Sequence, residues 1–318
     1  MMPPLNRRTV VLGGLAVLTA GCSASRQPAA AHPSSAPTSA PRLDPQLAEL
    51  AAEATLVATY DAALRAHPGL AASLRPIRAN HAEHLAALAT LTAKARPAGR
   101  AERIPASTAG TQRLLRMAEE RATRLLTQAC LAAGPPRAAL LGSIAASERS
   151  HLVPLGAAPT PAAAPTPAAA RTPAAVGGTA DLPGLQLALA GQQAVRWGYD
   201  VVGGQVPTAL QPAVRAAQAG HVAVEEVLSA AVRARNARPV AAQAAYSLPF
   251  PVAGQRAALR LAAQLEDGST GSWHYLLATT GDRAVRSLAI AMLGNAAVQA
   301  VVWRARYGSP TTVALPGS

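Results

Sequence analysis

Six acidic or imidazole side chains are expected on the inner faces of predicted helices: Glu53, His81, His84, Glu119, Glu148 and His151. Five of them share a helix face with Leu, Ile or Val, and Glu119 lies at the margin of its face. Burying such groups is costly unless they gain a hydrogen bond, a proton or a metal ion. Since carboxylates and imidazoles bind iron, manganese and zinc, these residue types predict a transition-metal site.

The spacing of these residues repeats along the chain. Glu53 precedes His81 by 28 residues, and Glu119 precedes Glu148 by 29. An imidazole follows three positions later on the same helix face in both cases, His84 after His81 and His151 after Glu148. The repeat predicts a duplicated helical hairpin, with one acid on the first helix of each hairpin and a pair on the second.

Two interpretations of the six side chains remain open. In the first, they hold a metal. In the second, they hydrogen-bond to one another or to Arg side chains, as polar networks inside helical bundles do. Tyr60 lies on the same face as Glu53 and is expected to be a core tyrosine.

Helix start and stop signals place these residues on four helices, and four more helices follow a Pro-rich spacer. Strand-like alternation is missing, so we expect an all-α fold, with two antiparallel four-helix bundles in series. The predicted helices begin at Asp44-Pro45 and end before Pro68, run from Leu70 or Pro76 to Ala95, from Ser107 to Ala133 and from Pro135 onward, and then cover 183–202, 208–235, 254–279 and 283–306.

The N-terminus has the layout of an export signal. Arg7 and Arg8 precede a short apolar run, and the stretch LTAGC resembles a lipobox that ends at Cys22. Residues 1–22 are therefore predicted to be a lipoprotein signal peptide, exported by the general or the twin-arginine route, with Cys22 as the lipidated residue. We expect an extracytoplasmic protein anchored to the outer face of the cytoplasmic membrane.

Composition divides the rest of the chain. Residues 23–42 are rich in Ser, Ala and Pro and predict a disordered tether. The Pro- and Ala-rich stretch 158–180 predicts a linker between an N-terminal bundle, 43–157, and a C-terminal bundle, 181–308. Residues 309–318 are expected to be a tail.

The second predicted bundle keeps the hairpin spacing, but most of its equivalent positions carry neither an acid nor an imidazole. Gln192 and His221 are 29 residues apart, as are Glu266 and Asn295, whereas Val224 and Val298 stand where the second imidazoles would be. We expect Gln192, His221, Glu266 and Asn295 to form a degenerate, hydrogen-bonded cluster rather than a metal site.

Charge and motifs exclude several function classes. The net charge is +13, but residues 43–157 and 181–318 each carry only +4, and no basic run is interleaved with aromatic residues. A nucleic-acid surface is therefore not expected. Motifs for hydrolases, nucleotide binding and HExxH metalloproteases are absent.

Several stretches resemble a known family. They are the leader, LVATYDAALRAHPGL, QLALAGQQAVRWGYDVVGG, YSLPFPV and TTGDRAVRSLA. They are similar to the ferritin-like superfamily and, within it, to exported actinobacterial-type lipoproteins with a C-terminal ferritin-like domain of unknown function. The resemblance implies two ferritin-like bundles in tandem, with metal ligands at Glu53, His84, Glu119, Glu148 and His151. His81 stands where the family pattern has Glu, which gives three imidazoles and three carboxylates.

The sequence thus predicts an exported, lipid-anchored ferritin-like protein that binds iron, manganese or zinc in its N-terminal bundle. If it is an enzyme, we expect oxygen or peroxide chemistry at that metal. The alternative is a metal-free structural or partner-binding envelope lipoprotein. The membrane anchor is the one partner that the sequence indicates, and a protein partner or a homo-oligomer remains unspecified.

Overall fold

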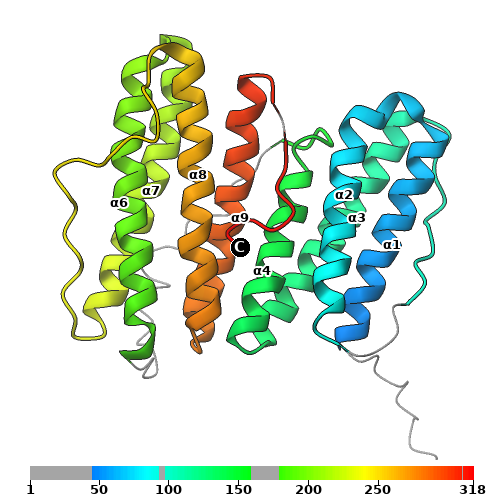
Figure 1. Cartoon of the computed structure of the whole chain (residues 1–318), viewed down its shortest axis with the longest axis horizontal. Coiled ribbons are helices and arrows are strands. Elements are labelled where there is room, and N and C mark those ends of the chain that lie inside the picture. Colours follow the sequence, from blue (N-terminus) through cyan, green and yellow to red (C-terminus); the bar gives the residue numbers. More distant parts are fainter. Residues whose placement is uncertain (1–44, 93–96, 159–178, 310) are drawn as a thin grey trace, which may run out of the picture. The chain divides into compact units, whose positions relative to one another are not determined.

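The computed structural model describes residues 45–92, 97–158, 179–309 and 311–318 (Figure 1). These residues contain eight α-helices and no strand, which confirms the predicted all-α class. Residues 43–318 form one compact unit. The predicted signal peptide, Cys22, the tether and most of the predicted linker lie outside the described residues.

The first four helices form two hairpins, with α1 packed on α2 and α3 on α4. Ser107 caps α3, because its Oγ accepts a hydrogen bond from the backbone N–H of Gly110 at 3.1 Å. The predicted end of the second helix at Ala95 is wrong, since Thr90 and the nearby Pro97 disfavour further helix. The helices are α1 (Pro45–Ala66), α2 (Ala71–Ala89), α3 (Thr108–Ala132) and α4 (Pro135–His151).

The last four helices are arranged similarly, with α6 packed on α7 and α8 on α9. The first of them was expected to end at residue 202, before two glycines. Gly203 and Gly204 instead lie inside its last turn, because Gln211 donates to the carbonyls of Gly203 (2.6 Å) and Val206 (3.3 Å). Asp282 caps α9 through the N–H groups of two following residues. The helices are α6 (Leu182–Gln205), α7 (Gln211–Arg233), α8 (Gly254–Thr279) and α9 (Arg283–Arg306).

Helix α4 lies at the centre of the compact unit. It contacts α3 on one side and α8 and α9 on the other, so nearly every residue from Ala138 to His151 is buried. One apolar cluster joins residues from before and after the predicted linker, including Leu141 and Leu277. Among the described residues α9 alone has the length and composition of a membrane span, but it is mostly buried against other helices.

The inner face of α3 differs from the predicted one. The sequence pattern Leu115, Ala118, Ala122, Leu125 predicts Leu125 for the inner face, but this residue is 37% exposed, whereas Leu126 is buried. At 100° per residue, Leu126 lies about 20° around the helix from Leu115, and Leu125 lies about 80° away. Glu119, which was expected at the margin, is fully buried. All six predicted ligands are therefore inside the protein.

Candidate metal centre

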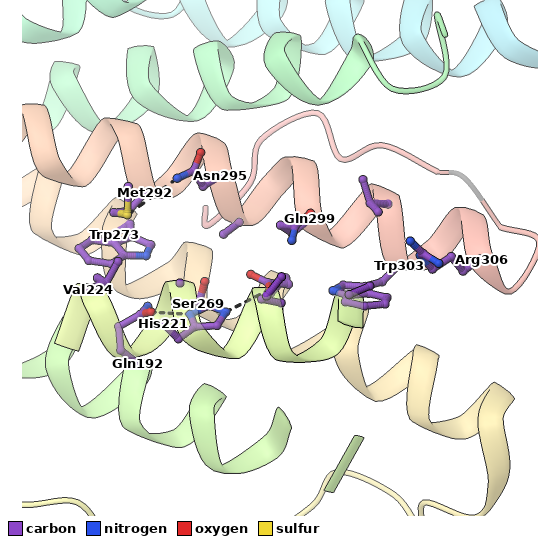
Figure 2. Close-up of a pocket in the computed structure, with 17 residues that line it drawn as sticks. Gln192, His221, Val224, Ser269, Trp273, Met292, Asn295, Gln299, Trp303 and Arg306 are labelled. Carbon is purple, nitrogen blue, oxygen red and sulfur yellow. Dashed lines mark hydrogen bonds and ion pairs between the residues drawn. The ribbon is translucent and has the colours of Figure 1, made fainter. Parts of the chain in front are cut away.

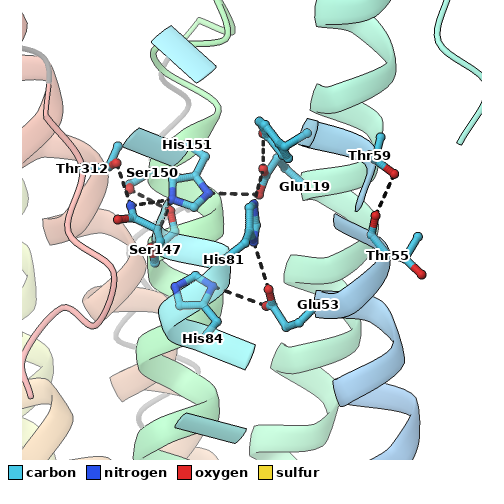
Figure 3. A network of polar contacts seen from close by, with 12 residues as sticks. Glu53, Thr55, Thr59, His81, His84, Glu119, Ser147, Ser150, His151 and Thr312 are labelled. Carbon is cyan, nitrogen blue, oxygen red and sulfur yellow. Dashed lines mark hydrogen bonds and ion pairs between the residues drawn. The ribbon is translucent and has the colours of Figure 1, made fainter. Parts of the chain in front are cut away.

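The structure brings the six predicted ligands together from four helices. Helix α1 supplies Glu53, α2 supplies His81 and His84, α3 supplies Glu119, and α4 supplies Glu148 and His151. Each of these residues is at most 1% exposed. Figure 3 shows the imidazoles of His81, His84 and His151 converging on the carboxylates of Glu53 and Glu119. Sequence positions far apart thus form one buried polar cluster.

Glu119 is hydrogen-bonded through both of its oxygens. Its Oε1 accepts from the hydroxyl of Tyr60 and lies 2.9 Å from His81 Nε2. Its Oε2 lies 3.1 Å from His151 Nδ1. These three partners satisfy the carboxylate without a metal, so this part of the cluster resembles a self-contained hydrogen-bond network.

Four atoms on the other side of the cluster have no hydrogen-bond partner among the described residues. They are both carboxylate oxygens of Glu148, Oε1 of Glu53 and Nδ1 of His84. The last two face each other at 3.4 Å, which is close enough for an ion pair but does not meet the geometry of a hydrogen bond. Leaving a buried polar atom unpaired costs roughly 1–3 kcal/mol, so four of them around one place require an explanation.

The protonation states follow from burial and from the neighbouring charges. Burial opposes a charge on His81, yet Glu119 and Glu53 outweigh it and raise the pKa of His81 to about 10. Burial raises the pKa of Glu148 well above its usual range, and the charges of Glu53 and Glu119 add to this effect. In the metal-free protein at neutral pH, His81 is therefore an imidazolium and Glu148 a neutral acid.

The remaining acids and His151 have the opposite tendencies. Burial opposes ionisation of Glu53 and Glu119, but the neighbouring imidazoles lower the pKa of both carboxyl groups. Burial lowers the pKa of His151 to about 4, although Glu119 opposes this shift. His151 is thus neutral at pH 7, and its Nε2 lies 3.0 Å from Asn80 Nδ2 and 3.2 Å from Ser147 Oγ.

Two ligand groups have atoms close enough together to hold a metal ion. The first comprises Glu53, His81, His84 and Glu148, and the second comprises His81, Glu119 and His151, with the ligand atoms of each group within 4.8 Å of one another. Metal bonds of about 2.0–2.2 Å place ligands about 3–4 Å apart, so little movement is needed. The first group contains all four unpaired atoms. Its two imidazoles and two carboxylates suit iron, manganese or zinc.

The second half of the chain contains a similar network around Glu266. Tyr199 donates to Glu266 Oε1 at 2.5 Å, and His221 Nε2 lies 3.2 Å from the same oxygen. His221 Nδ1 lies 2.7 Å from Gln192 Oε1 (Figure 2). The Tyr–Glu–His arrangement of the first half, made by Tyr60, Glu119 and His81, is thus repeated.

The two halves differ at the positions of Glu53, His84 and Glu148, the residues of the first half whose buried atoms make no hydrogen bond. The hairpin spacing places Gln192 at the position of Glu53, Val224 at that of His84 and Asn295 at that of Glu148. Asn295 and Val224 line a cavity of about 500 Å³ beside the network (Figure 2). None of the four residues of the predicted degenerate cluster belongs to a metal-binding group among the described residues.

Some neighbours of the site gave no signal in the sequence. Asn80 and Ser147 contact His151, and the backbone carbonyl of Ala314 lies 2.7 Å from His84 Nε2. Small polar residues on helices are common, and a carbonyl carries no sequence signature. Contacts that join residues more than 200 positions apart cannot be found from helix periodicity.

The match to a known family concerns the second half of the chain. Residues 184–318 match the family model DUF4439, a domain of unknown function. No curated protein matches the chain. A crystal structure of a conserved hypothetical protein from Mycobacterium tuberculosis is similar, with 30% identity and a TM-score of 0.38, over 41% of this chain and 98% of that one. The C-terminal region of the chain, residues 184–318, therefore contains a DUF4439 domain.

Proposed function

We propose that the helices of the first half bind one transition-metal ion through Glu53, His81 Nδ1, His84 Nδ1 and Glu148. The observation that carries this proposal is the set of unpaired buried atoms in this group, in contrast to the fully hydrogen-bonded Glu119. Glu119 then acts as the outer partner that orients His81, as carboxylates do behind metal-bound imidazoles.

The repeated network of the second half supports the same assignment. The Tyr, Glu and His that are satisfied in the first half are present in both halves. The three residues with unpaired atoms are replaced in the second half by Gln192, Val224 and Asn295. A purely structural network would need no buried carboxyl group whose oxygens make no hydrogen bond, whereas a metal would use these oxygens.

We further propose that the protein consists of two ferritin-like bundles in tandem, the first with a metal and the second without one. The helix order and the ligands from four facing helices support this assignment. Iron or manganese, when bound, would supply redox chemistry with oxygen or peroxide. The residues of the chain would hold the ion, exclude bulk water and, through Glu119 and Tyr60, keep His81 oriented.

Metal analysis of protein purified without a chelator tests the proposal. The wild type is expected to contain close to one transition-metal ion per chain, and His84→Ala is expected to lose it, because an unpaired ligand atom is removed. His274→Ala, a half-buried imidazole of the second half, serves as the control and should keep the metal. A wild type without metal, even after incubation with iron, manganese and zinc salts, would contradict the proposal.

Metal binding is expected to release protons. A metal must displace the proton on His81 Nδ1, whose pKa is about 10, and the proton that the raised pKa keeps on Glu148. Near pH 7 roughly two protons should leave per ion, and the apparent affinity should rise about 100-fold per pH unit. Calorimetric titration of Zn²⁺ in two buffers of different ionisation enthalpy measures the number. Release of no protons would mean that neither group is a ligand.

We also propose that the protein is exported and anchored through a lipid on Cys22 to the outer face of the cytoplasmic membrane. The sequence LTAGC after an apolar leader supports this location. In cell fractionation the wild type is expected with the membranes, whereas Cys22→Ser should remain an uncleaved precursor without lipid. Equal lipid labelling of both proteins would exclude Cys22 as the anchor.

A further inference from the structure

The segment Thr311–Ser318 follows the last helix but lies against the first half of the chain. Ser143 and Ser147, both buried on α4, donate hydrogen bonds of 2.8 Å to the carbonyls of Pro316 and Val313. Figure 1 shows this segment, in red, returning from α9 toward α4. It belongs to the matched family region, 184–318, and yet it contacts the helices that carry the candidate ligands.

Its most direct contact with the metal centre is a backbone carbonyl. His84 Nε2 lies 2.7 Å from the carbonyl oxygen of Ala314, and both residues are buried. A carbonyl only accepts hydrogen bonds, so Nε2 must carry a hydrogen. In the neutral imidazole the lone pair is then on Nδ1, the atom that faces Glu53 at 3.4 Å. The carbonyl therefore selects the tautomer that can bind a metal.

A second contact reaches His151. Asn80 Nδ2 donates to Thr312 Oγ1 at 2.8 Å and lies 3.0 Å from His151 Nε2. Ser147, which donates to Val313, lies 3.2 Å from the same nitrogen. The segment thus supports the outer nitrogens of two of the three imidazoles in the cluster.

The segment is fixed at its far end by close packing on α8. Gly317 has φ +84°, a backbone conformation that favours glycine. A Cβ at this position would lie 2.5 Å from the carbonyl oxygen of Thr270 and 2.8 Å from His274 Cβ. Any larger residue would therefore force the segment away from α8, and the carbonyl of Ala314 would be expected to shift with it.

We propose that the segment Thr311–Ser318 is part of the metal centre, with the Ala314 carbonyl as the positioning group that sets the tautomer and orientation of His84. The inference rests on the proposed function, because it concerns the same site. It gives the family region a role in the first half of the chain: its last residues complete the outer shell of a metal site whose ligands all lie before residue 152. Outer partners of metal-bound imidazoles typically change metal affinity about 10–100-fold.

The test compares the full chain with a chain that lacks Thr311–Ser318. The affinity for Zn²⁺ is measured by competition with a chromophoric chelator, and ¹⁵N NMR of the imidazoles reports the tautomer of His84. The shortened chain is expected to bind Zn²⁺ about 10–100-fold more weakly. Its metal-free form should also lose the fixed Nε2–H tautomer of His84, a change that a general loss of stability would not produce in a folded chain.

Two substitutions complete the design. Gly317→Val keeps every backbone carbonyl but displaces the segment, so it should also weaken Zn²⁺ binding. If the shortened chain does not fold, this variant alone tests whether the segment affects Zn²⁺ affinity. Val222→Ala changes a side chain on α7 that is 39% exposed and lies outside the segment, and this variant should bind Zn²⁺ like the wild type.

The possible failures are distinguishable. If Zn²⁺ binds equally well to the wild type, the shortened chain and Gly317→Val, this inference is wrong while the proposed metal site stands. If the wild type binds no metal, the proposed function itself fails. An unchanged Nε2–H tautomer of His84 in the folded shortened chain would also overturn the positioning role of Ala314.

Discussion

A triple variant, Glu53→Gln, His84→Val and Glu148→Asn, is expected to fold and to bind transition metals more than about 1000-fold more weakly than the wild type. It removes three of the four proposed ligands, whereas loss of a single outer partner already costs about 10–100-fold. The residues introduced are those that the second half carries at the equivalent positions, Gln192, Val224 and Asn295. The second half shows that a similar network packs with this set.

Stability and metal affinity are measured on the same samples. After chelator treatment, the free energy of unfolding of the triple variant is expected to be about 3–5 kcal/mol lower than that of the wild type. Glu53→Gln removes one of the two carboxylates beside the His81 imidazolium, and His84→Val removes the partner of the Ala314 carbonyl, whereas the oxygens of Glu148 make no hydrogen bond. The matched control is Glu83→Gln with Glu120→Gln, which removes two acids on the exposed sides of α2 and α3. This control should bind metal normally. Normal binding by the triple variant would place the metal elsewhere.

Replacing His81 by Ala is expected to lower the free energy of unfolding of the metal-free protein by about 3–5 kcal/mol. The imidazolium lies 2.9 Å from an oxygen of Glu53 and 2.9 Å from an oxygen of Glu119, all of them buried. Its removal leaves two buried carboxylates without their shared positive partner, and breaking a buried ion pair typically costs this much.

The pH dependence of this loss identifies its cause. The pKa of His81 is raised from 6.5 to about 10 on folding, so its stabilising contribution is complete below pH 6.5 and is lost as the pH rises toward 10. The pKa values of Glu53 and Glu119 are lowered, so their contribution is present above their ordinary pKa of 4.5 and is lost in acid. The effect of His81→Ala should therefore be larger at pH 6 than at pH 9 in denaturant titrations.

His221→Ala is the matched control for this variant. His221 contacts one carboxylate, Glu266, and one neutral amide, Gln192, and its side chain is 12% exposed. Its removal should destabilise the protein less than removal of His81 does. Equal losses for the two variants, independent of pH, would show that lost packing rather than charge pairing stabilises the cluster.

The sequence was sufficient to predict the all-α class, the four helices that the structure describes on either side of the Pro-rich stretch, and the burial of the six polar residues. Helix periodicity and capping residues are local signals, so most predicted ends lie within a few residues of the observed ones. The errors occurred where side-chain contacts outside the helix itself determine where it ends or which face is buried. Gly203 and Gly204 stay helical because Gln211 satisfies the last turn, and Glu119 is fully buried rather than marginal.

The spacing could not predict which of the six side chains are hydrogen-bonded to one another and which have atoms free to bind a metal. Periodicity places Glu119 and Glu148 on similar faces, but Glu119 has three hydrogen-bond partners, whereas Glu148 makes no such bond and has its pKa raised by burial and by the nearby Glu53 and Glu119. This difference depends on Tyr60 and on side-chain directions across helices. The contact between Ala314 and His84 joins positions 230 residues apart, which no helical repeat can indicate.

The most direct measurement of the central claim is a crystal structure of the metal-loaded protein, with diffraction data collected on both sides of the absorption edge of the metal. We predict one anomalous peak in the first half, about 2.0–2.2 Å from oxygens of Glu53 and Glu148 and from Nδ1 of His81 and of His84. A peak only at surface residues, or an anomalous map without a peak while Glu148 remains unpaired, would contradict the metal centre.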